Sequence, residues 1–481
     1  MNRKMVFYTI GQMLVTEAVL LLLPTLVSII YNDGCLSSFL ITIGIALVLG
    51  GALVFLCRTK NQVIYAKEGF VTVSLVWITM SLVGALPFYI SGEIPSYVDA
   101  FFETVSGFTT TGASILTDVE SMSRSLLFWR SFTHWVGGMG VLVFVMAIIP
   151  NVSDRSIHLM RAEVPGPTVG KLMPKIKDTA KILYVIYIAM TFIMIIFLLC
   201  GNMPVFDSIV HAFGAAGTGG FGIRNSSIAE YSPYLQWVIT VFMTLFGVNF
   251  NLYYLIILGK LGTALKSREL WCYLGIILVS TAIITVNIMP LYDGFSEAVR
   301  NAAFQVSSIS TTTGYATADF NMWPGLSKGI LFLLMFSGAC AGSTAGGLKI
   351  SRVIILFKLI KKEFKHMLHP RSVSGVKFEG KQVEDSTLRG VSNYFAIYIL
   401  CFVAVFTVLC FEPFDLETNI TASAACFNNI GPGLAGVGPT ANYSAYSSIA
   451  KIVLSFAMLL GRLEIFPLII ALSPRTWGKK A

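Results

Sequence analysis

The stretches that decide the fold of this chain are GFTTTGAS at 107–114, GTGGFGI at 217–223, STTTGYAT at 310–317 and NNIGPGL at 428–434. Each closes a semi-apolar segment that is too short to cross a bilayer, which takes about 20 apolar residues in a helix. These segments cover 96–113, 204–222, 295–315 and 418–433. Irregular backbone is tolerated at membrane depth only where protein buries it or it lines a water-filled cavity. The four segments therefore predict half-length helices that share one aqueous pathway.

Long apolar blocks surround these segments. Of the 481 residues, 55% are hydrophobic and 12% are charged, whereas soluble domains average about 25% charged residues. The expected spans are 5–31, 37–57, 70–91, 128–150, 180–200, 234–258, 271–290, 327–360, 391–411 and 446–473. The composition excludes an ordinary soluble protein and predicts an all-α polytopic membrane protein.

The order of these elements repeats along the chain. A helix, a half-helix with its loop and a second helix occur four times, and the glycines Gly112, Gly220, Gly314 and Gly431 lie 108, 94 and 117 residues apart. Such a period indicates an internal repeat. We expect an N-terminal transmembrane hairpin at 1–69, followed by pore repeats at 70–150, 151–260, 261–365 and 366–481.

The basic residues set the orientation in the membrane. With the N-terminus inside, the six inner segments hold 27 of the 34 Lys and Arg residues, as the positive-inside rule requires. Both termini are then cytoplasmic, and every half-helix enters from the outer face. The repeats are therefore parallel, unlike the inverted repeats of many secondary transporters. This placement assigns the formal charge of +9 to orientation and not to nucleic-acid binding.

The chemistry of the four quoted stretches suits a cation. A filter replaces the hydration shell of K⁺ with consecutive backbone carbonyls that point at one axis, and glycine accepts the backbone angles that this demands. A short helix that ends at the filter directs its negative C-terminal end toward the ion. One threonine-glycine stretch is usually a plain loop, but four at equivalent places predict a pore with pseudo-fourfold symmetry.

Together with HWVGGMG at 134–140, GACAGSTAGGLK at 338–349 and GRLEIF at 461–466, these stretches resemble the Trk/Ktr/HKT superfamily of cation-translocating subunits. Ten spans, two of them extra at the N-terminus, are most similar to the TrkH family. The resemblance implies K⁺ as the transported ion, no organic cofactor in this chain, a bacterial inner-membrane location among membrane lipid, a homodimer, and a cytosolic TrkA-type nucleotide-binding ring as regulator. By position it implies four filter rows: Thr110, Thr111 and Gly112; Thr218, Gly219 and Gly220; Thr312, Thr313 and Gly314; and Asn429, Ile430 and Gly431.

Two filter rows depart from the threonine pattern. Gly219 replaces a threonine in the second row, and the fourth row has Asn429 and Ile430, with Pro432 after its glycine. The ring is therefore not fourfold symmetric, and we expect weaker discrimination between K⁺ and Na⁺ than in a tetrameric channel. In the plant HKT relatives a serine at the position of Gly112 goes with Na⁺ preference, so glycine there favours K⁺.

Glycines interrupt the eighth apolar block at Gly338, Gly342, Gly346 and Gly347, just before Lys349. Close helix packing through small residues is one interpretation. An unwound loop that gates ion flow under the filter is the other, and the family resemblance supports it, with Lys349 helping to position the loop.

Arg462 is a basic residue about sixteen positions into the last expected span, 446–473. A charge at that depth costs about 2.5 to 3.5 kcal/mol on insertion scales, so it needs a wet cavity or a fixed partner. One interpretation is a structural hydrogen bond to carbonyls of a neighbouring repeat. The other places the guanidinium at the constriction beside the glycine-rich loop, where it repels cations and helps to hold the pore shut.

Particular residues in the sequence bear on other possible functions. No nucleophile, base and orienting residue can be assembled, which argues against an enzyme. A K⁺ symporter coupled to H⁺ or Na⁺ stays open, with Glu17 and Glu464 as the acids inside spans. The basic loop 358–381 is the first candidate for docking the regulatory ring, and a positive-inside anchor is the alternative for the same charges.

Overall fold

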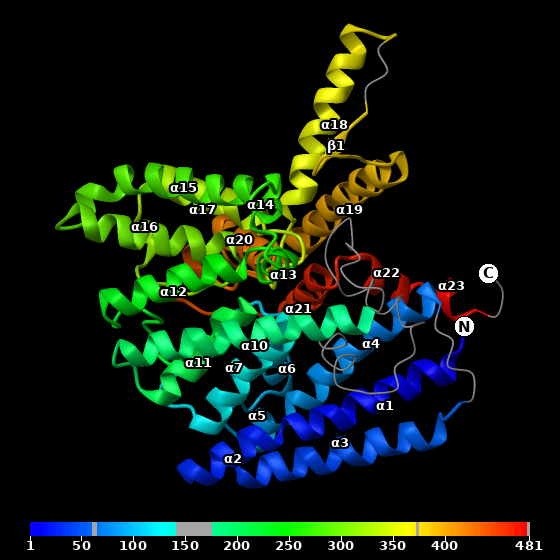
Figure 1. Ribbon diagram of the computed structural model, residues 1–481. Coiled ribbons are helices and arrows are strands. Elements are labelled where there is room, and N and C mark those ends of the chain that lie inside the picture. The colour runs from blue at the N-terminus through cyan, green and yellow to red at the C-terminus, as the bar shows by residue number, and fades with distance from the viewer. Residues whose placement is uncertain (60–64, 141–175, 372–374, 479–481) are drawn as a thin grey trace.

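Helices form nearly all of the regular structure (Figure 1). The computed structural model describes residues 1–59, 65–140, 176–371 and 375–478. The N-terminal part contains α1 (Arg3–Leu20), α2 (Leu22–Tyr31), α3 (Leu36–Leu56), α4 (Ala66–Gly84), α5 (Leu86–Ile90), α6 (Tyr97–Phe108) and α7 (Arg124–Gly138). The middle part contains α10 (Ile176–Cys200), α11 (Val205–Gly217), α12 (Pro233–Phe246), α13 (Phe250–Ile257), α14 (Leu261–Ala264), α15 (Arg268–Ile288), α16 (Phe295–Ser310) and α17 (Gly325–Phe336).

The C-terminal part contains α18 (Ile350–Leu368), α19 (Asp385–Leu409), α20 (Leu416–Phe427), α21 (Ser448–Arg462), α22 (Phe466–Leu472) and α23 (Pro474–Trp477). Short 3₁₀ turns are η2 (Met289–Leu291), η3 (Phe320–Met322) and η4 (Ala435–Val437). Strands β1 (Lys377–Phe378) and β2 (Lys381–Gln382) pair antiparallel, with Lys377 opposite Gln382.

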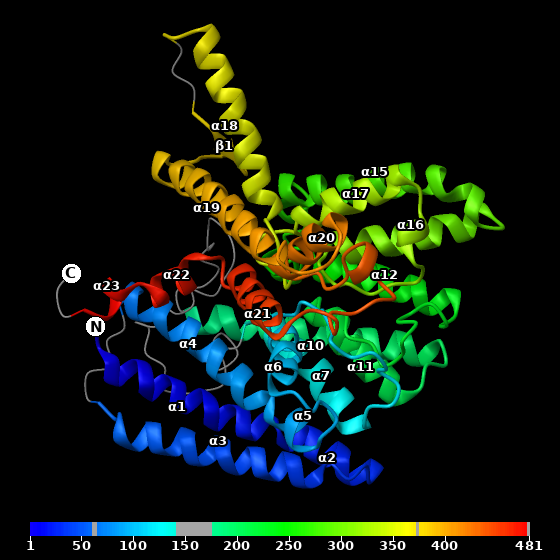
Figure 2. The ribbon, with the colours of Figure 1, turned by 180° about the vertical axis from the view of Figure 1, so that it is seen from behind.

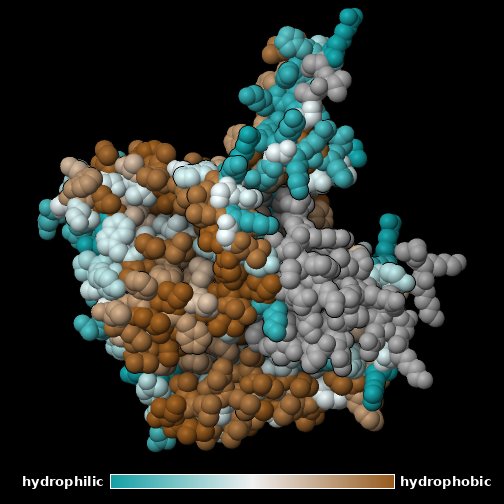
Figure 3. Space-filling model, viewed as in Figure 1, coloured by the Kyte–Doolittle hydropathy of each residue, from teal (hydrophilic) through white to brown (hydrophobic). Residues whose placement is uncertain are grey.

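The helices have the length and composition of membrane spans. Among the described residues, six are long and apolar enough to cross a bilayer, and the bent pair α12 and α13 would make a seventh. Apolar residues cover much of the side of the helical body, whereas polar residues cover the projecting α18 (Figure 3). The prediction of an all-α polytopic membrane protein is confirmed.

The half-helices meet at the centre of the body. They are α6, α11, α16 and α20, and each ends at the beginning of its quoted stretch. The helix after each half-helix packs on the half-helix of the next repeat: α7 on α11, α12 on α16, α17 on α20, and α21 on α6. Because the last of these contacts returns to the first repeat, the repeats close into a ring.

The helices that follow the second, third and fourth half-helices are interrupted, where the sequence led us to expect continuous spans at 234–258, 327–360 and 446–473. The axes of α12 and α13 differ by 90°. Residues 337–349 separate α17 from α18, and residues 463–465 separate α21 from α22. Glycines favour such breaks, because a glycine inside a helix is less stable than an alanine by about 1 kcal/mol. Neighbouring elements can form hydrogen bonds with the backbone groups that a break leaves unpaired. The expected span 128–150 is described only as far as Gly140, so its inner half lies outside the described residues.

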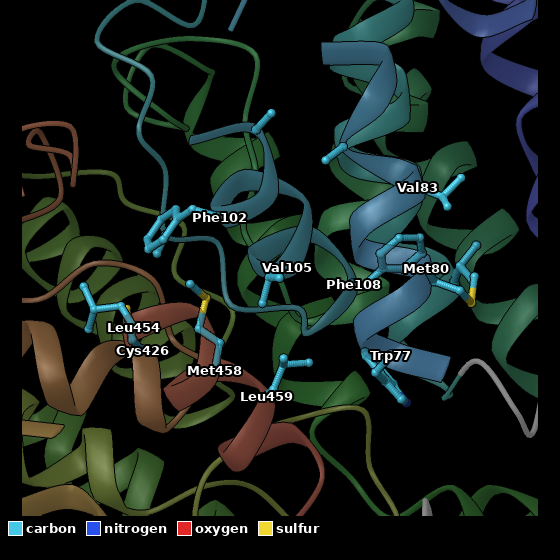
Figure 4. Close-up of a cluster of buried hydrophobic side chains, with 14 of the residues drawn as sticks. Trp77, Met80, Val83, Phe102, Val105, Phe108, Cys426, Leu454, Met458 and Leu459 are labelled. Carbon is cyan, nitrogen blue, oxygen red and sulfur yellow. The ribbon is translucent and has the colours of Figure 1, made fainter. Parts of the chain in front are cut away.

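The N-terminal hairpin packs against the outside of the ring. Helix α1 contacts α3 and α4, and α2 contacts α7. Gly11 and Gly50 bring α1 and α3 together, because a Cβ on either would lie within 3.0 Å of the other's carbonyl oxygen. On the inner side, Trp77 and Met80 of α4 lie near Phe108 of α6 in a buried apolar cluster (Figure 4).

Both chain termini lie at one end of the helical body, and α18 projects away from the rest of it (Figures 1 and 2). The projecting helix begins directly after residues 337–349. The boundary expected between residues 365 and 366 falls inside α18, and that between 69 and 70 falls inside α4.

Candidate functional site

The four filter rows have the same backbone geometry. The middle residue of each row donates its N–H to the carbonyl five residues earlier, at 2.8 to 2.9 Å. The third residue is a glycine with φ between 77° and 97°. The first residue has a left-handed backbone with φ from 54° to 58°, at Thr110, Thr218, Thr312 and Asn429. This is the Schellman type of helix end, and it occurs at the same position in each repeat.

The glycine that ends each row adjoins the next repeat. A Cβ on Gly112 would lie within 3.0 Å of the carbonyl oxygen of Gly219. In the same way, a Cβ on Gly220 would lie within 3.0 Å of the carbonyl oxygen of Thr313, and a Cβ on Gly314 within 3.0 Å of that of Ile430. A Cβ on Gly431 would lie 2.7 Å from the carbonyl oxygen of Thr111, back in the first repeat. The rows therefore meet around one centre, where positive φ and close approach both require glycine.

The carbonyl oxygens of the filter rows are almost free of hydrogen-bond donors. Within the described parts of the chain, the one donor to any of them is the Tyr443 hydroxyl, which bonds the Gly431 oxygen at 2.8 Å. Buried backbone carbonyls in proteins are nearly always paired with protein or water. A ring of unpaired carbonyls is the environment that can replace the water shell of an alkali cation.

A cavity of about 130 Å³ opens on the glycine side of the rows. Its lining includes Gly112, Gly220, Gly314 and Gly431. Two arginines in the lining are paired with carboxylates, Arg130 with Glu103 at 2.5 Å and Arg224 with Glu230 at 2.8 Å. The Nδ2 of Asn225, which also lines the cavity, donates to Oδ1 of Asp118 at 2.9 Å and thereby lowers the pKa of Asp118. That carboxylate stays charged at neutral pH beside the mouth and favours a cation there.

His134 of α7 explains the missing threonine at Gly219. A Cβ on Gly219 would lie within 3.0 Å of the His134 ring. The ring Nδ1 bonds the carbonyl oxygen of Gly107 at 2.8 Å, and the N–H of Phe221 donates to Nε2 at 3.3 Å. Since a carbonyl can only accept and an N–H can only donate, the imidazole is neutral with its proton on Nδ1. The imidazole occupies the space that a side chain at position 219 would need.

Asn429 joins the fourth row to the first. Its Nδ2 donates to Oγ1 of Thr111 at 3.0 Å and to the carbonyl oxygen of Met458 at 2.9 Å. The Thr111 hydroxyl also bonds that of Thr109, and in the third row the Thr313 hydroxyl bonds that of Thr311, both at 2.8 Å. The departures from the threonine pattern thus have specific partners, and the expected asymmetry of the ring is present in the contacts.

The glycine-rich loop (337–349) lies against the third and fourth filter rows. The N–H of Gly346 donates to Oγ1 of Thr312 at 2.7 Å, and a Cβ on Gly346 would lie within 3.0 Å of the Asn428 carbonyl oxygen. Gly338 also packs closely, since its Cβ would meet the Gly346 carbonyl. Gly342 and Gly347 have φ of 73° and 65°. Close packing therefore accounts for two of the glycines and loop geometry for the other two.

Backbone and carboxylate contacts hold the loop to its neighbours. Oε1 of Glu269, in α15, accepts from the N–H of Ala341 at 2.8 Å and from that of Ser351 at 3.1 Å. The N–H of Phe250, next to the break between α12 and α13, donates to the carbonyl oxygen of Gly342 at 3.1 Å. Sequence reasoning missed Glu269, because nothing near it in the chain marks a contact with residues more than 70 positions away.

Asn249 lies just before α13, at the break that separates this helix from α12. Its Oδ1 accepts from the N–H of Asn251 at 2.9 Å. Asn249 therefore caps the N-terminus of α13, which is a common role for asparagine at a helix start.

Arg462 connects the glycine-rich loop to the first repeat. Its NH1 donates to the carbonyl oxygen of Thr344 at 2.7 Å, and its NH2 donates to that of Gly138 at 2.7 Å and also to that of Gly137. Glu464 pairs with Arg352 of α18 at 2.5 Å. Both sequence-based interpretations of Arg462 describe part of this arrangement: the guanidinium bonds a neighbouring repeat and lies beside the loop.

Lys349 lies at the inner end of the loop and is 2% exposed. Its Nζ donates to the carbonyl oxygen of Ala345, and also to that of Gly346 at 3.5 Å. A buried ammonium therefore holds the turn of the loop that contacts the filter.

The chain has close relatives among known proteins. The family described as TrkH, cation transport protein, matches residues 36–274 and 276–479. The Trk system potassium uptake protein TrkH of Salmonella typhimurium is 34% identical over 475 residues, which cover 97% of this chain and 98% of that protein. The corresponding protein of Halomonas elongata is 32% identical over 492 residues, with both chains covered in full.

A solved structure has the same fold. The crystal structure of the potassium transporter TrkH from Vibrio parahaemolyticus superimposes with a TM-score of 0.89 and 32% sequence identity. The match covers 99% of this chain and 100% of that chain. The likeness thus extends over the ring, the loop and the N-terminal hairpin.

Proposed function

This chain belongs to the TrkH family of cation transport proteins, and from that premise we propose that it takes up potassium ions across the bacterial inner membrane through the ring of filter rows. It is a multi-pass bacterial membrane protein. Its relatives are potassium uptake proteins and not enzymes, in agreement with the lack of an assembled catalytic site in the sequence.

The observation that carries the proposal is the ring of filter carbonyls, all of which except that of Gly431 lack a hydrogen-bond donor among the described residues. Oxygen ligands of this kind, held by glycines that adjoin the next repeat, match what a dehydrated K⁺ needs. An inside-negative potential supplies about 2.3 kcal/mol per charge for each 100 mV, which is enough to drive uptake without another energy source.

The glycine-rich loop is the proposed gate. It contacts the filter through Gly346 and Thr312, and Arg462 fixes it to the end of α7. Gly338, Gly342 and Gly347 give the loop the close packing and positive φ described above. Lys349 holds the turn of the loop, and Arg462 adds positive charge beside the loop, which opposes cation entry while the loop is in place.

The partners follow from the same family. The proposal includes a homodimer among membrane lipids, cytoplasmic termini, and a cytosolic TrkA-type nucleotide-binding ring that regulates the gate. The common end at which both termini lie fits this orientation (Figure 1). Helix α18 leads from the glycine-rich loop out of the helical body (Figure 2), so force applied to it would reach the loop.

Reversing the charges of Lys361, Lys362 and Lys365 to glutamate should weaken binding of the regulatory ring. These side chains lie on the projecting part of α18, where electrostatic attraction to an acidic surface is strongest at low salt. The measurement is a pull-down of the ring by the purified chain at two salt concentrations. A triple charge reversal at Lys260, Lys266 and Arg268, which are exposed and lie outside the basic loop 358–381, is the matched control. Equal binding by wild type and the α18 variant would place the interface elsewhere.

The proposed function is tested by reversal potentials. The full chain in liposomes, under opposed K⁺ and Na⁺ gradients, should show a reversal potential close to that of K⁺. A current that follows neither gradient would refute the proposed pathway.

A second candidate function, K⁺ symport coupled to H⁺, rests on Glu17. This residue is fully buried, and neither of its carboxylate oxygens has a hydrogen-bond partner within the described residues. It lies against α4, where a Cβ on Gly84 would be 2.9 Å from Oε1. A carboxylate without partners is costly to bury, and binding a proton removes that cost.

Glu17→Gln separates the two candidate functions. The amide is neutral and nearly isosteric with a protonated carboxyl group, so uptake through a passive pore should stay at the wild-type rate. In a symporter the same change would abolish stimulation by a proton gradient. The measurement is K⁺ uptake into liposomes with and without a pH gradient. Proton stimulation that is present in wild type and lost in the variant would favour the symporter.

A further inference from the structure

The glycine of the fourth filter row differs from the other three. Gly431 is buried, whereas Gly112, Gly220 and Gly314 are partly exposed. Its φ is 97°, compared with 81°, 77° and 84° in the first three rows. A Cβ added to Gly431 would lie 2.7 Å from the carbonyl oxygen of Thr111, and this is the longest such distance to a neighbouring filter row among the four glycines. These differences coincide with the hydrogen bond from Tyr443 to the Gly431 carbonyl oxygen.

Tyr443 is held rigidly in the position that makes this bond. It is 2% exposed, and its backbone N–H donates to the carbonyl oxygen of Ser114 at 2.8 Å. Its ring lies against Phe102 at 5.7 Å and Tyr446 at 6.0 Å between centroids. The contact therefore links the fourth filter row to the segment that follows the first.

Ser114 is itself fixed by a buried ion pair. Its Oγ donates to Oε1 of Glu103 at 3.0 Å and accepts from NH2 of Arg130 at 3.1 Å. Glu103 and Arg130 pair at 2.5 Å, with side chains that are almost fully buried. A chain of contacts thus runs from Glu103 in α6 and Arg130 in α7 through Ser114 to Tyr443 and the filter.

We infer that Tyr443 sets ion specificity by withdrawing the Gly431 carbonyl from the ion pathway, so that the site at the level of the filter glycines has carbonyl ligands from three repeats. The inference rests on the proposed function, because it requires K⁺ to pass through this ring. The hydroxyl proton occupies a lone pair of the carbonyl oxygen and places positive charge beside it. A site with fewer carbonyl dipoles distinguishes K⁺ from Na⁺ less well, in the view that ligand number sets selectivity.

Tyr443→Phe should therefore raise selectivity. The variant keeps the ring and its packing but leaves the Gly431 carbonyl oxygen without a donor. That oxygen can then turn toward the ion and gain the free energy of binding it. If the gain is that of one ordinary hydrogen bond, the K⁺/Na⁺ permeability ratio should rise about fivefold. The ratio is measured from reversal potentials of the full chain in liposomes.

Tyr446→Phe is the matched control. Tyr446 is 4% exposed and stacks on Tyr443, but its hydroxyl donates to Oδ1 of Asn419 at 3.0 Å and not to a filter residue. The control should leave the ratio unchanged. An increase of equal size in both variants would overturn the inference, because it would trace the effect to packing.

The outcomes separate this inference from the proposed function. A ratio that is unchanged or lower in Tyr443→Phe, while wild type conducts K⁺, overturns the role of Tyr443 alone. A wild-type protein that conducts no K⁺ overturns the proposed function. Should Tyr443→Phe fail to fold, fluorotyrosine at position 443 keeps the hydroxyl and makes it a stronger donor. It should lower the ratio, and an unchanged or higher ratio would also overturn the inference.

Discussion

Gly112→Ser is expected to lower the K⁺/Na⁺ permeability ratio by about tenfold or more. A Cβ at this position would lie within 3.0 Å of the Gly219 carbonyl oxygen, so the backbone of the second row must move. The φ of 81° adds strain, which costs an L-residue about 1 to 2 kcal/mol in the left-handed region. Since about 1.4 kcal/mol corresponds to a factor of ten, displacement of one filter carbonyl is enough for this loss. The measurement is the reversal potential under opposed K⁺ and Na⁺ gradients.

Gly92→Ser separates backbone strain from displacement of the carbonyl. Gly92 also has a φ of 81°, but nothing lies within 4 Å of the position that its Cβ would take. It should reduce stability slightly and leave selectivity unchanged. Thr111→Ala and Thr313→Ala should lower the ratio less than Gly112→Ser, because their backbone carbonyls remain. If Gly112→Ser kept the wild-type ratio, the assignment of a carbonyl ring to the first row would be wrong.

The local features of the fold were predictable from the sequence. Half-helices, positive-φ glycines and long apolar blocks depend on residues that are close in the chain, so they leave a pattern in the sequence. The quoted stretches therefore located all four half-helices, and the structure places each helix end at the start of its stretch. The 90° break between α12 and α13 was harder to foresee, because an apolar run reads the same whether the helix is straight or bent.

Contacts between repeats were not predictable in the same way. The sequence shows that Gly219 departs from threonine, but the cause is the ring of His134, which is 85 positions away. Glu269 accepts hydrogen bonds from the N–H groups of Ala341 and Ser351, more than 70 positions away, and the Tyr443 hydroxyl donates to Gly431, 12 positions away. A side chain that bonds one distant backbone atom imposes no periodicity on its neighbours. Only the folded chain brings such pairs together.

Arg462→Ala should increase K⁺ flux by about tenfold in the absence of the regulatory ring. The guanidinium bonds the Thr344 carbonyl in the glycine-rich loop and the Gly138 carbonyl of the first repeat. Hydrogen bonds from a charged group contribute about 1.5 to 3 kcal/mol each, so loss of these bonds frees the loop from the end of α7. The same change removes a positive charge from the proposed ion pathway, and both effects favour opening. Flux is measured in liposomes, after size-exclusion chromatography has shown that the variant assembles as the wild type does.

Arg462→Lys distinguishes the two effects. A lysine keeps the positive charge, but its single ammonium lacks the planar fork with which arginine spans separate acceptors. If the bridge between Thr344 and Gly138 holds the loop, the lysine variant should conduct nearly as well as the alanine variant. If repulsion of cations is the main barrier, it should stay close to wild type. An alanine variant that folds but conducts no more than wild type would refute the gating role, and one that fails to assemble would favour the purely structural interpretation of Arg462.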